Sequence, residues 1–273
     1  MSAASGALSS SLAVKAADVF VKSWISGTRL TPETLPAAPE SIDAMYETHL
    51  AIQTHPLVAS DLGSHAGYKL GAIGAEGQPC IYAPLFGNFV TDKAEQVSAS
   101  AIQLWQIEPE IALILGEEIA PATDGKPHSV DDVWAAVSEV ALCIELCGKR
   151  GTPEAYAATT KLGSFADTLS SGGVVLGPRL PAKSMSVASV LCPTKLLVNS
   201  ELLAEGSGAA APEGGPAQAL TWLANHLNGR GLSLQKGQVV ATGQTCNTKA
   251  IKAGDIVKVT FGELGEFEMA VAP

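Results

Sequence analysis

The sequence predicts an α+β fold in which helices at the front of the chain precede a larger, strand-rich part. Apolar residues recur at helical spacing near the start, as in residues 13–24. After residue 66 the apolar runs become short and are separated by glycine, which is typical of strands joined by turns. We therefore expect a helical segment at 1–65 and, at 66–273, sheets wrapped into a barrel or roll. The two parts should form one integrated domain.

Composition and charge restrict the class of protein. With 47% hydrophobic and 16% charged residues among 273, the chain suits a compact globular protein with a substantial core. The formal net charge of −10 and the pI near 4.9 argue against nucleic acid or an anionic membrane as a partner. The longest apolar runs, such as 111–115 and 137–146, are too short or too interrupted to span a bilayer.

Cysteine usage indicates a reducing compartment. The five cysteines are odd in number and show no C-x-x-C spacing, which favours free thiols over disulfides or a zinc site. We expect a cytoplasmic protein. The Ser/Ala-rich residues 1–12 predict a flexible terminus. Import into an organelle is left open.

The expected elements follow from periodicity and capping. Helices are expected at 13–24, at 41–54 with Ser41 as N-cap and His55-Pro56 as terminator, at 129–137 with Ser129 as N-cap, and at 218–228. Gly/Ala-rich residues 148–163 show no clear period and predict a mobile covering loop, in which a short helix is left open. Extended segments are expected at 66–71, 83–87, 100–104, 107–115, 137–146, 173–176, 195–198, 238–242, 256–261 and 267–271.

Two carboxylates stand at alternate positions of an apolar run. Because a strand repeats every two residues, Glu108 and Glu110 should project from the same face. Two buried acids side by side repel each other and lose hydration, so a cation between them would stabilise the pair. The alternative is a solvated strand edge, which Pro109 also suits because it cannot donate to a sheet ladder.

A third acid, Glu145, is a lone carboxylate in the apolar run 137–146. A buried charge needs a partner, so one interpretation is a salt bridge to lysine or arginine. The other joins Glu145 to Glu108 and Glu110 in a three-carboxylate site. Oxygen ligands of this kind favour Mg²⁺ or Mn²⁺ over zinc.

Six short motifs follow one another along the chain. They are GYKLG at 67–71, IEPEIA at 107–112, IEL at 144–146, AD with SSG at 166–172, LAN at 223–225 and AGD at 253–255. In this order they resemble the fumarylacetoacetate hydrolase superfamily, and more narrowly its 2-keto-4-pentenoate hydratase / 4-oxalocrotonate decarboxylase branch. Glutamate at 145, where the hydrolase branch typically carries aspartate, is also similar to the hydratases.

The resemblance implies a mixed β-roll fold, with 66–273 as the catalytic domain and with assembly into homo-oligomers. It implies Mg²⁺ (or Mn²⁺) held by Glu108, Glu110 and Glu145, and a small 2-oxo or dienol carboxylic acid as substrate. The implied activity is that of a 2-keto-4-pentenoate hydratase-like hydro-lyase working through a metal-stabilised enolate. Alternatives are a 2-oxo acid decarboxylase, a C–C hydrolase, or a non-catalytic homologous subunit.

Two residues match positions to which the family assigns catalysis. Lys69 falls in the K-x-G motif that ends at Gly71, and a lysine near a metal under a covering loop can have a depressed pKa and move protons. Its alternative is an exposed lysine at a strand end. Asp167 falls on the A-D-N motif, with Thr168 in place of asparagine, and its alternative is a turn or cap.

Substrate contacts are implied at Gly71 and at the T-G-x-T turn formed by Thr242, Gly243 and Thr245, which could equally be an ordinary strand end. One departure concerns the reaction. Leu85 precedes Phe-Gly where the branch often carries an aspartate used in hydration. A hydrolase would need a His/Glu pair, for which His49 and His65 are the only plausible histidines.

Overall fold

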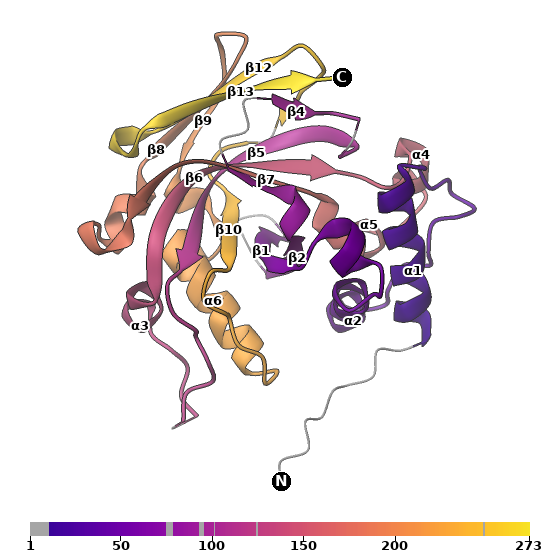
Figure 1. Cartoon of the computed structure of the whole chain (residues 1–273), viewed down its shortest axis with the longest axis horizontal. Coiled ribbons are helices and arrows are strands. Elements are labelled where there is room, and N and C mark those ends of the chain that lie inside the picture. Colours follow the sequence, from indigo (N-terminus) through magenta and orange to yellow (C-terminus); the bar gives the residue numbers. More distant parts are fainter. Residues whose placement is uncertain (1–10, 75–78, 93–95, 101, 124, 248) are drawn as a thin grey trace.

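The computed structural model describes residues 11–273 except 75–78, 93–95, 101, 124 and 248. Helices α1 (Ser11–Ser26) and α2 (Ile42–Gln53) pack together at one side of the molecule (Figure 1). Both predicted helices are confirmed, and the Ser41 side chain caps α2 by accepting the Ala44 amide at 3.1 Å. The expectation of a flexible terminus falls largely on residues 1–10, outside the described residues.

The larger sheet carries the middle of the chain and is strongly curled (Figure 1). Its order is β2-β1-β10-β5-β6-β7-β3, with β11 beside β5. The pairs β1/β10 and β3/β7 are parallel, and the other pairs are antiparallel. The strands are β1 (His65–Ala72), β2 (Cys80–Phe86), β3 (Val90–Asp92), β5 (Leu104–Leu115), β6 (Val137–Gly148), β7 (Ser171–Pro181), β10 (Val239–Gln244) and β11 (Lys249–Ala250).

A second, five-stranded sheet closes over β7 at the top of Figure 1, in the order β4-β13-β12-β8-β9. Burial alternates along β12, so one face of this sheet packs inward and the other is exposed. Gly177 of β7 lies against the Phe267 ring, where a Cβ would come within 2.5 Å. The strands are β4 (Gln96–Ser98), β8 (Pro193–Val198), β9 (Glu201–Ser207), β12 (Ile256–Phe261) and β13 (Glu266–Ala272).

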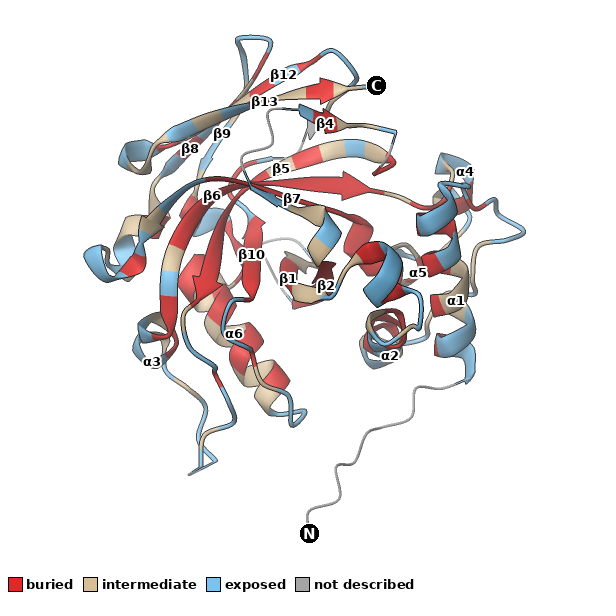
Figure 2. Cartoon of the chain, viewed as in Figure 1, coloured by how far each residue is buried: buried red, intermediate tan, exposed pale blue. Residues whose placement is uncertain are grey.

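Helix α6 (Pro216–Asn228) packs against β10 and β5 and next to α3 (Val130–Ala135). Its predicted apolar face is buried, as the stripe along α6 in Figure 2 shows. Leu220, Leu223 and Leu227 are each at most 1% exposed, and burying a leucine contributes about 1.5–3 kcal/mol relative to leaving it in water. One hydrophobic cluster joins the helices to both sheets. The described residues form no helix with the length and apolarity needed to cross a membrane.

The α+β class with a rolled sheet is confirmed, and some local details differ from the predictions. The expected strand at 100–104 is wrong: β5 begins at Leu104, because residues 102–103 turn and Gln103 adopts a left-handed φ of 52°. The expected loop at 148–163, in which a short helix was left open, contains α4 (Pro153–Ala157) and the start of α5 (Lys161–Phe165), capped by Thr152 and Thr160. Strands β3, β4, β9 and β11 were not predicted.

Candidate metal and substrate site

The acids of β5 and β6 are brought together by strand register. Glu108 lies directly opposite Glu145 in the antiparallel pair, and Glu110 lies opposite Cys143. Directly opposed residues project from the same face, and so do alternate residues along one strand. Glu110 and Glu145 are completely buried and Glu108 is half-buried. The solvated-edge interpretation of Glu108 and Glu110 is therefore wrong for Glu110.

The ligand atoms fit a divalent cation. One ligand atom each from Glu108, Glu145 and Cys147 lies within 4.8 Å of the others. Glu110 stands outside this close group, yet its Oε1, like Oε2 of Glu145, is buried and receives no hydrogen bond from an N–H or hydroxyl donor among the described residues, and the two carboxyl groups lie within hydrogen-bonding reach of each other. A buried polar atom without a partner costs about 1–3 kcal/mol, and more if it is charged. A hard cation with oxygen ligands would remove that cost.

Burial also raises the pKa of Glu110 and Glu145. Desolvation is the main cause for Glu110, whose pKa rises well above its usual range, with the charges of Glu145 and Glu108 adding to it. For Glu145 burial raises the pKa to about 7, although the Lys69 ammonium opposes the shift. A cation beside these two carboxyl groups would stabilise their charged forms.

Lys69 of β1 reaches this cluster from across the sheet. It is 4% exposed, and its Nζ forms an ion pair with Oε1 of Glu145 and donates to the Leu169 carbonyl at 3.1 Å. The exposed-lysine alternative is therefore wrong, and the salt-bridge interpretation of Glu145 holds. Burial lowers the Lys69 pKa, but Glu145 and Glu108 outweigh it, so the net direction is upward. The depressed pKa that we expected is not produced by the protein groups.

Asp167 lies in a separate buried network. Arg150 Nε donates to its Oδ1 at 2.6 Å, the Arg150 amide donates to Oδ2 at 3.0 Å, and the Tyr156 hydroxyl also donates to Oδ2. Both side chains of the Arg150–Asp167 pair are 1% exposed. The Asp167 carboxylate is therefore paired with the Arg150 guanidinium. Asp167 is not among the residues that line the cavity described below.

That network shapes the segment after Asp167. Thr168, Leu169 and Ser170 all have positive φ, between 46° and 60°, and Arg150 Nη2 donates to Thr168 Oγ1 at 3.2 Å. Left-handed backbone costs about 1–2 kcal/mol per L-residue, so surrounding contacts must hold it. The turned backbone directs the Leu169 carbonyl to Lys69. Asp167 thus acts on the site indirectly, through residues 168–170.

The predicted turn at the end of β10 is tied to β5. Thr242 Oγ1 donates to the Ile111 carbonyl at 2.6 Å, and Thr245 Oγ1 donates to the Pro109 carbonyl at 2.8 Å. The Gly243 amide donates to Oε2 of Glu110 at 2.9 Å. These groups fix the strand that carries the acids, and the neighbouring Gln244 faces the cavity.

A cavity of about 700 Å³ opens at Glu108, the half-buried acid of the three, and Glu110 and Glu145 lie behind its lining. Lys69, Gly71 and Glu108 line it as predicted, and its remaining wall was largely missed. Cys147 and Gln106 stand two residues from Glu145 and Glu108, so strand alternation alone could have placed them on the same face. Further lining residues that the sequence did not reveal are Trp105, Lys149, Ser164, Phe165, Leu169, Ser170, Ala209, Ala210, Ala211, Pro212 and Gln244.

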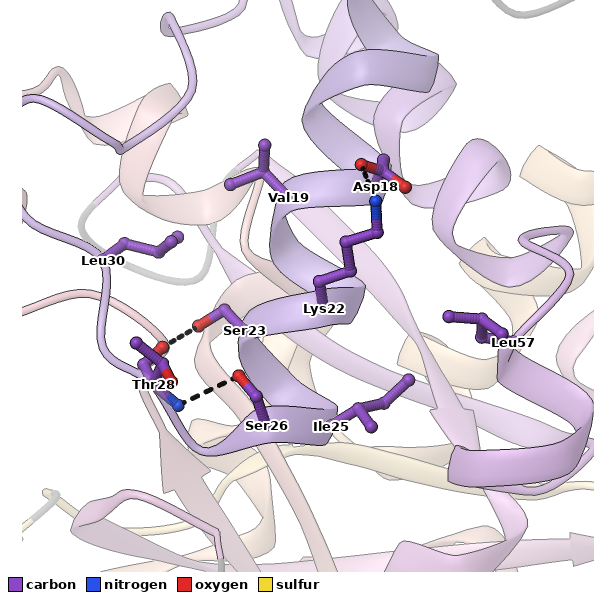
Figure 3. Close-up of a pocket in the computed structure, with 9 residues that line it drawn as sticks. All are labelled: Asp18, Val19, Lys22, Ser23, Ile25, Ser26, Thr28, Leu30 and Leu57. Atoms are coloured by element: carbon purple, nitrogen blue, oxygen red, sulfur yellow. Dashed lines mark hydrogen bonds and ion pairs between the residues drawn. The ribbon is translucent and has the colours of Figure 1, made fainter.

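A second cavity, of about 580 Å³, runs along α1 (Figure 3). Its two charged lining residues, Asp18 and Lys22, already pair with each other at 2.8 Å. The walls otherwise carry small or aliphatic side chains and hydroxyls, among them Ser23, which donates to the Thr28 carbonyl. This cavity holds none of the predicted site residues.

The histidines and Leu85 lie outside the cavity lining. His49 is buried with Nε2 at 2.9 Å from the Phe165 carbonyl, and His65 lies beside Gln238. Burial lowers the pKa of each to about 4. Leu85 on β2 is 1% exposed and packs in an apolar cluster with Ala241 of β10.

Known proteins share this sequence pattern and fold. Residues 72–272 match the model of the family described as fumarylacetoacetate (FAA) hydrolase C-terminal. The chain is 30% identical to 2-keto-4-pentenoate hydratase 1 of Dechloromonas aromatica over 205 residues, which are 73% of this chain and 74% of that protein. It is 26% identical to the TodF product hydratase of Pseudomonas putida over 264 residues, 94% of each.

Among solved structures, 4-oxalocrotonate decarboxylase from Pseudomonas putida G7, complexed with magnesium and adipate, superposes with a TM-score of 0.79. The sequence identity is 20%, and the match covers 95% of this chain and 97% of that one. Fumarylpyruvate hydrolase from Pseudomonas aeruginosa, in complex with Mn²⁺ and pyruvate, gives a TM-score of 0.58 at 13% identity and covers 75% and 88%. These likenesses establish the fold.

Proposed function

This chain belongs to the fumarylacetoacetate hydrolase family, and we propose that it is a divalent-metal-dependent lyase acting on a small 2-oxo carboxylic acid. The relatives named 2-keto-4-pentenoate hydratase support hydration as the reaction. The observation that carries the proposal is the pair of buried oxygens, on Glu110 and Glu145, that receive no hydrogen bond from an N–H or hydroxyl donor of the described residues, next to an ion-paired lysine at a cavity.

We propose Mg²⁺, or Mn²⁺, as the metal, with Glu108, Glu110 and Glu145 as its ligands. Their oxygens suit a hard cation, and Cys147 adds a soft thiol at the edge of the set. When bound, a divalent cation supplies positive charge against the negative charge that develops on the substrate's 2-oxygen.

Lys69 is the proposed proton donor and acceptor. The Glu145 carboxylate and the Leu169 carbonyl fix its ammonium group at the cavity wall, so its position does not depend on solvent. From there Nζ can give a proton to a substrate carbon or recover one from it. Asp167 would contribute by holding the 167–170 segment in place. Gly71 would contribute by leaving room beside Lys69, where a Cβ would meet nothing within 4 Å.

We propose an indirect role for the T-G-x-T turn. Thr242, Gly243 and Thr245 would orient Glu110 and the end of β5, with Gln244 as the residue of this turn that meets substrate.

Decarboxylation is the second candidate reaction. Hydration needs a group that activates water, and Leu85 places an apolar side chain where the branch often carries an acid. Decarboxylation needs the same charge stabilisation at the 2-oxygen but no base for water. Buried Leu85 therefore favours keeping a 2-oxo acid decarboxylase beside the hydratase.

The test is Mg²⁺ titration by calorimetry together with turnover of 2-hydroxypenta-2,4-dienoate and of a 2-hydroxymuconate-type acid. We expect wild type to bind one Mg²⁺ per chain and to turn over at least one acid, with carbon dioxide release separating decarboxylation from hydration.

Glu145→Gln should weaken Mg²⁺ binding at least tenfold and abolish turnover, because it removes a ligand charge. Glu205→Gln on exposed β9 is the matched control. Unchanged Mg²⁺ affinity in Glu145→Gln would overturn the site, and metal binding without turnover would favour a non-catalytic subunit.

A further inference from the structure

Lys149 is the second lysine of the cavity wall, and the proposed reaction does not use it. It directly follows Gly148, the last residue of β6, so it stands beyond Cys147 on the strand that carries Glu145. Its amide donates to the Gln103 carbonyl at 3.2 Å, which anchors the backbone at the mouth of the cavity. The side chain is half-buried.

Two aromatic rings hold the Lys149 ammonium. Nζ lies 3.8 Å from the centroid of the Trp105 ring and 4.9 Å from that of Tyr156. Trp105 also lines the cavity and is 38% exposed, so this end of the cavity is open to solvent. Cation–π contacts of this kind fix the position of an ammonium group but accept none of its three N–H donors.

Within the described part of the chain, no carboxylate forms an ion pair with Lys149. Lys69, in contrast, forms an ion pair with Glu145, and Asp167 forms one with Arg150. The cavity wall thus carries Glu108 of the acid cluster and, at Lys149, a cation that forms no ion pair among the described residues. Lys149 stands four residues beyond Glu145 along the chain.

Part of the cavity wall is apolar. It is lined there by Ala209, Ala210, Ala211 and Pro212, which offer contact to a carbon chain without competing for its charged groups. A ligand with one anionic group at the acids and metal, a short carbon chain, and a second anionic group at Lys149 would match these three features of the wall.

We propose that Lys149 binds the distal carboxylate of the substrate, so that the preferred substrate is a 2-oxo dicarboxylic acid. This inference rests on the proposed function, because the first carboxylate and the 2-oxygen are taken to lie at the acid cluster. A hydrogen bond to a charged group contributes about 1.5–3 kcal/mol, which corresponds to about tenfold or more in affinity.

The experiment compares two six-carbon acids, adipate with two carboxylates and hexanoate with one, by calorimetry in saturating Mg²⁺. Wild type should bind adipate at least tenfold more tightly. Lys149→Met keeps the apolar stem on Trp105 but removes the charge, and it should abolish that preference. Lys149→Arg should retain it. Lys195→Met, on β8, makes the same change in net charge at an exposed position and should leave the preference unchanged.

Turnover provides a second measurement. Lys149→Met should raise KM for a 2-oxo dicarboxylate about tenfold or more while kcat and the KM for a monocarboxylate stay within twofold. Wild type without preference for adipate, or a preference that survives in Lys149→Met, would overturn the role of Lys149. Failure of wild type to bind Mg²⁺ would instead overturn the proposed metal site, so the two failures can be told apart.

Discussion

Asp167 illustrates how a motif residue can act on a site without entering it. Its carboxylate accepts hydrogen bonds from Arg150 and Tyr156, and the chain that follows delivers a carbonyl to Lys69. Arg150 also stacks on Trp24 of α1, with its guanidinium carbon 4.2 Å from the ring centroid. The N-terminal helix is thereby connected to the segment that faces the cavity.

We expect Asp167→Ala to lower the free energy of unfolding by about 3–5 kcal/mol, because it leaves the buried Arg150 charge without its partner. Urea denaturation monitored by circular dichroism measures the change. Glu205→Ala, which breaks the exposed Lys195–Glu205 pair, should cost at most about 1 kcal/mol. Equal losses in the two variants would contradict the anchoring role of Asp167.

The residues of the site differ in how far sequence could predict them. Glu108 and Glu110 are visible because acids interrupt an apolar run, and Lys69 because a motif marks it. Trp105 and Lys149 carry no such mark. They meet the cavity because of where β5 starts and β6 ends, and the pairing of these strands shifts register between Leu104 and Gln106. A shift of this kind depends on tertiary packing.

At the scale of elements, the parallel pair β1/β10 sets the position of Lys69. Gly67, Tyr68 and Lys69 lie opposite Val239, Val240 and Ala241. Gly67 has φ of 146°, and a Cβ there would lie 1.9 Å from the Val239 carbonyl oxygen. This close approach of two backbones permits only glycine.

Gly67→Ala should therefore destabilise the protein by about 3 kcal/mol or more, since the β1/β10 contact must open. Gly71→Ala lies on the same strand with open space around its Cβ, and it should change stability by no more than about 0.5 kcal/mol. Thermal unfolding of both variants beside wild type gives the comparison. A stable Gly67→Ala variant would show that the strands can separate without cost.

The elements themselves were predicted better than their pairing. Long, strongly patterned stretches such as β5, β6 and α6 emerge from apolar periodicity and capping alone. A short helix was allowed at 148–163, but α4 and α5 could not be placed there because five residues of alanine- and glycine-rich chain show no period. The lone acid in each apolar run made the meeting of Glu108 and Glu145 one of two interpretations, and the family resemblance favoured it, because pairing of non-adjacent residues leaves no local signal.

At the scale of the whole molecule, buried neutral histidines make stability depend on pH. Burial lowers the pKa of His49 to about 4, whereas an unfolded histidine titrates near 6.5. Between these values the unfolded state binds more protons, so stability is present above pH about 6.5 and is lost as pH falls toward 4. At 1.36 kcal/mol per pKa unit the loss approaches about 3 kcal/mol.

His49→Gln should remove most of this loss. We expect the free energy of unfolding of the variant, measured by urea titration between pH 7 and pH 4.5, to fall less than that of wild type. At pH 7 the free energies of unfolding of wild type and His49→Gln are compared where protonation of His49 contributes little, so a difference there reports a change in packing at the buried position. A parallel decline in the two proteins would assign the acid sensitivity to other groups, beginning with His65, whose pKa is also lowered to about 4.

The Leu169 carbonyl that meets Lys69 belongs to the main chain, and this has a consequence for mutational tolerance. Replacement of the Leu169 side chain leaves the acceptor in place, so this contact cannot be deleted at residue 169. Apart from a change of Lys69 itself, it is lost by releasing the turn, through Arg150 or Asp167. Selection on this contact would therefore act on the sequence at 150 and 167, at positions whose side chains never touch Lys69.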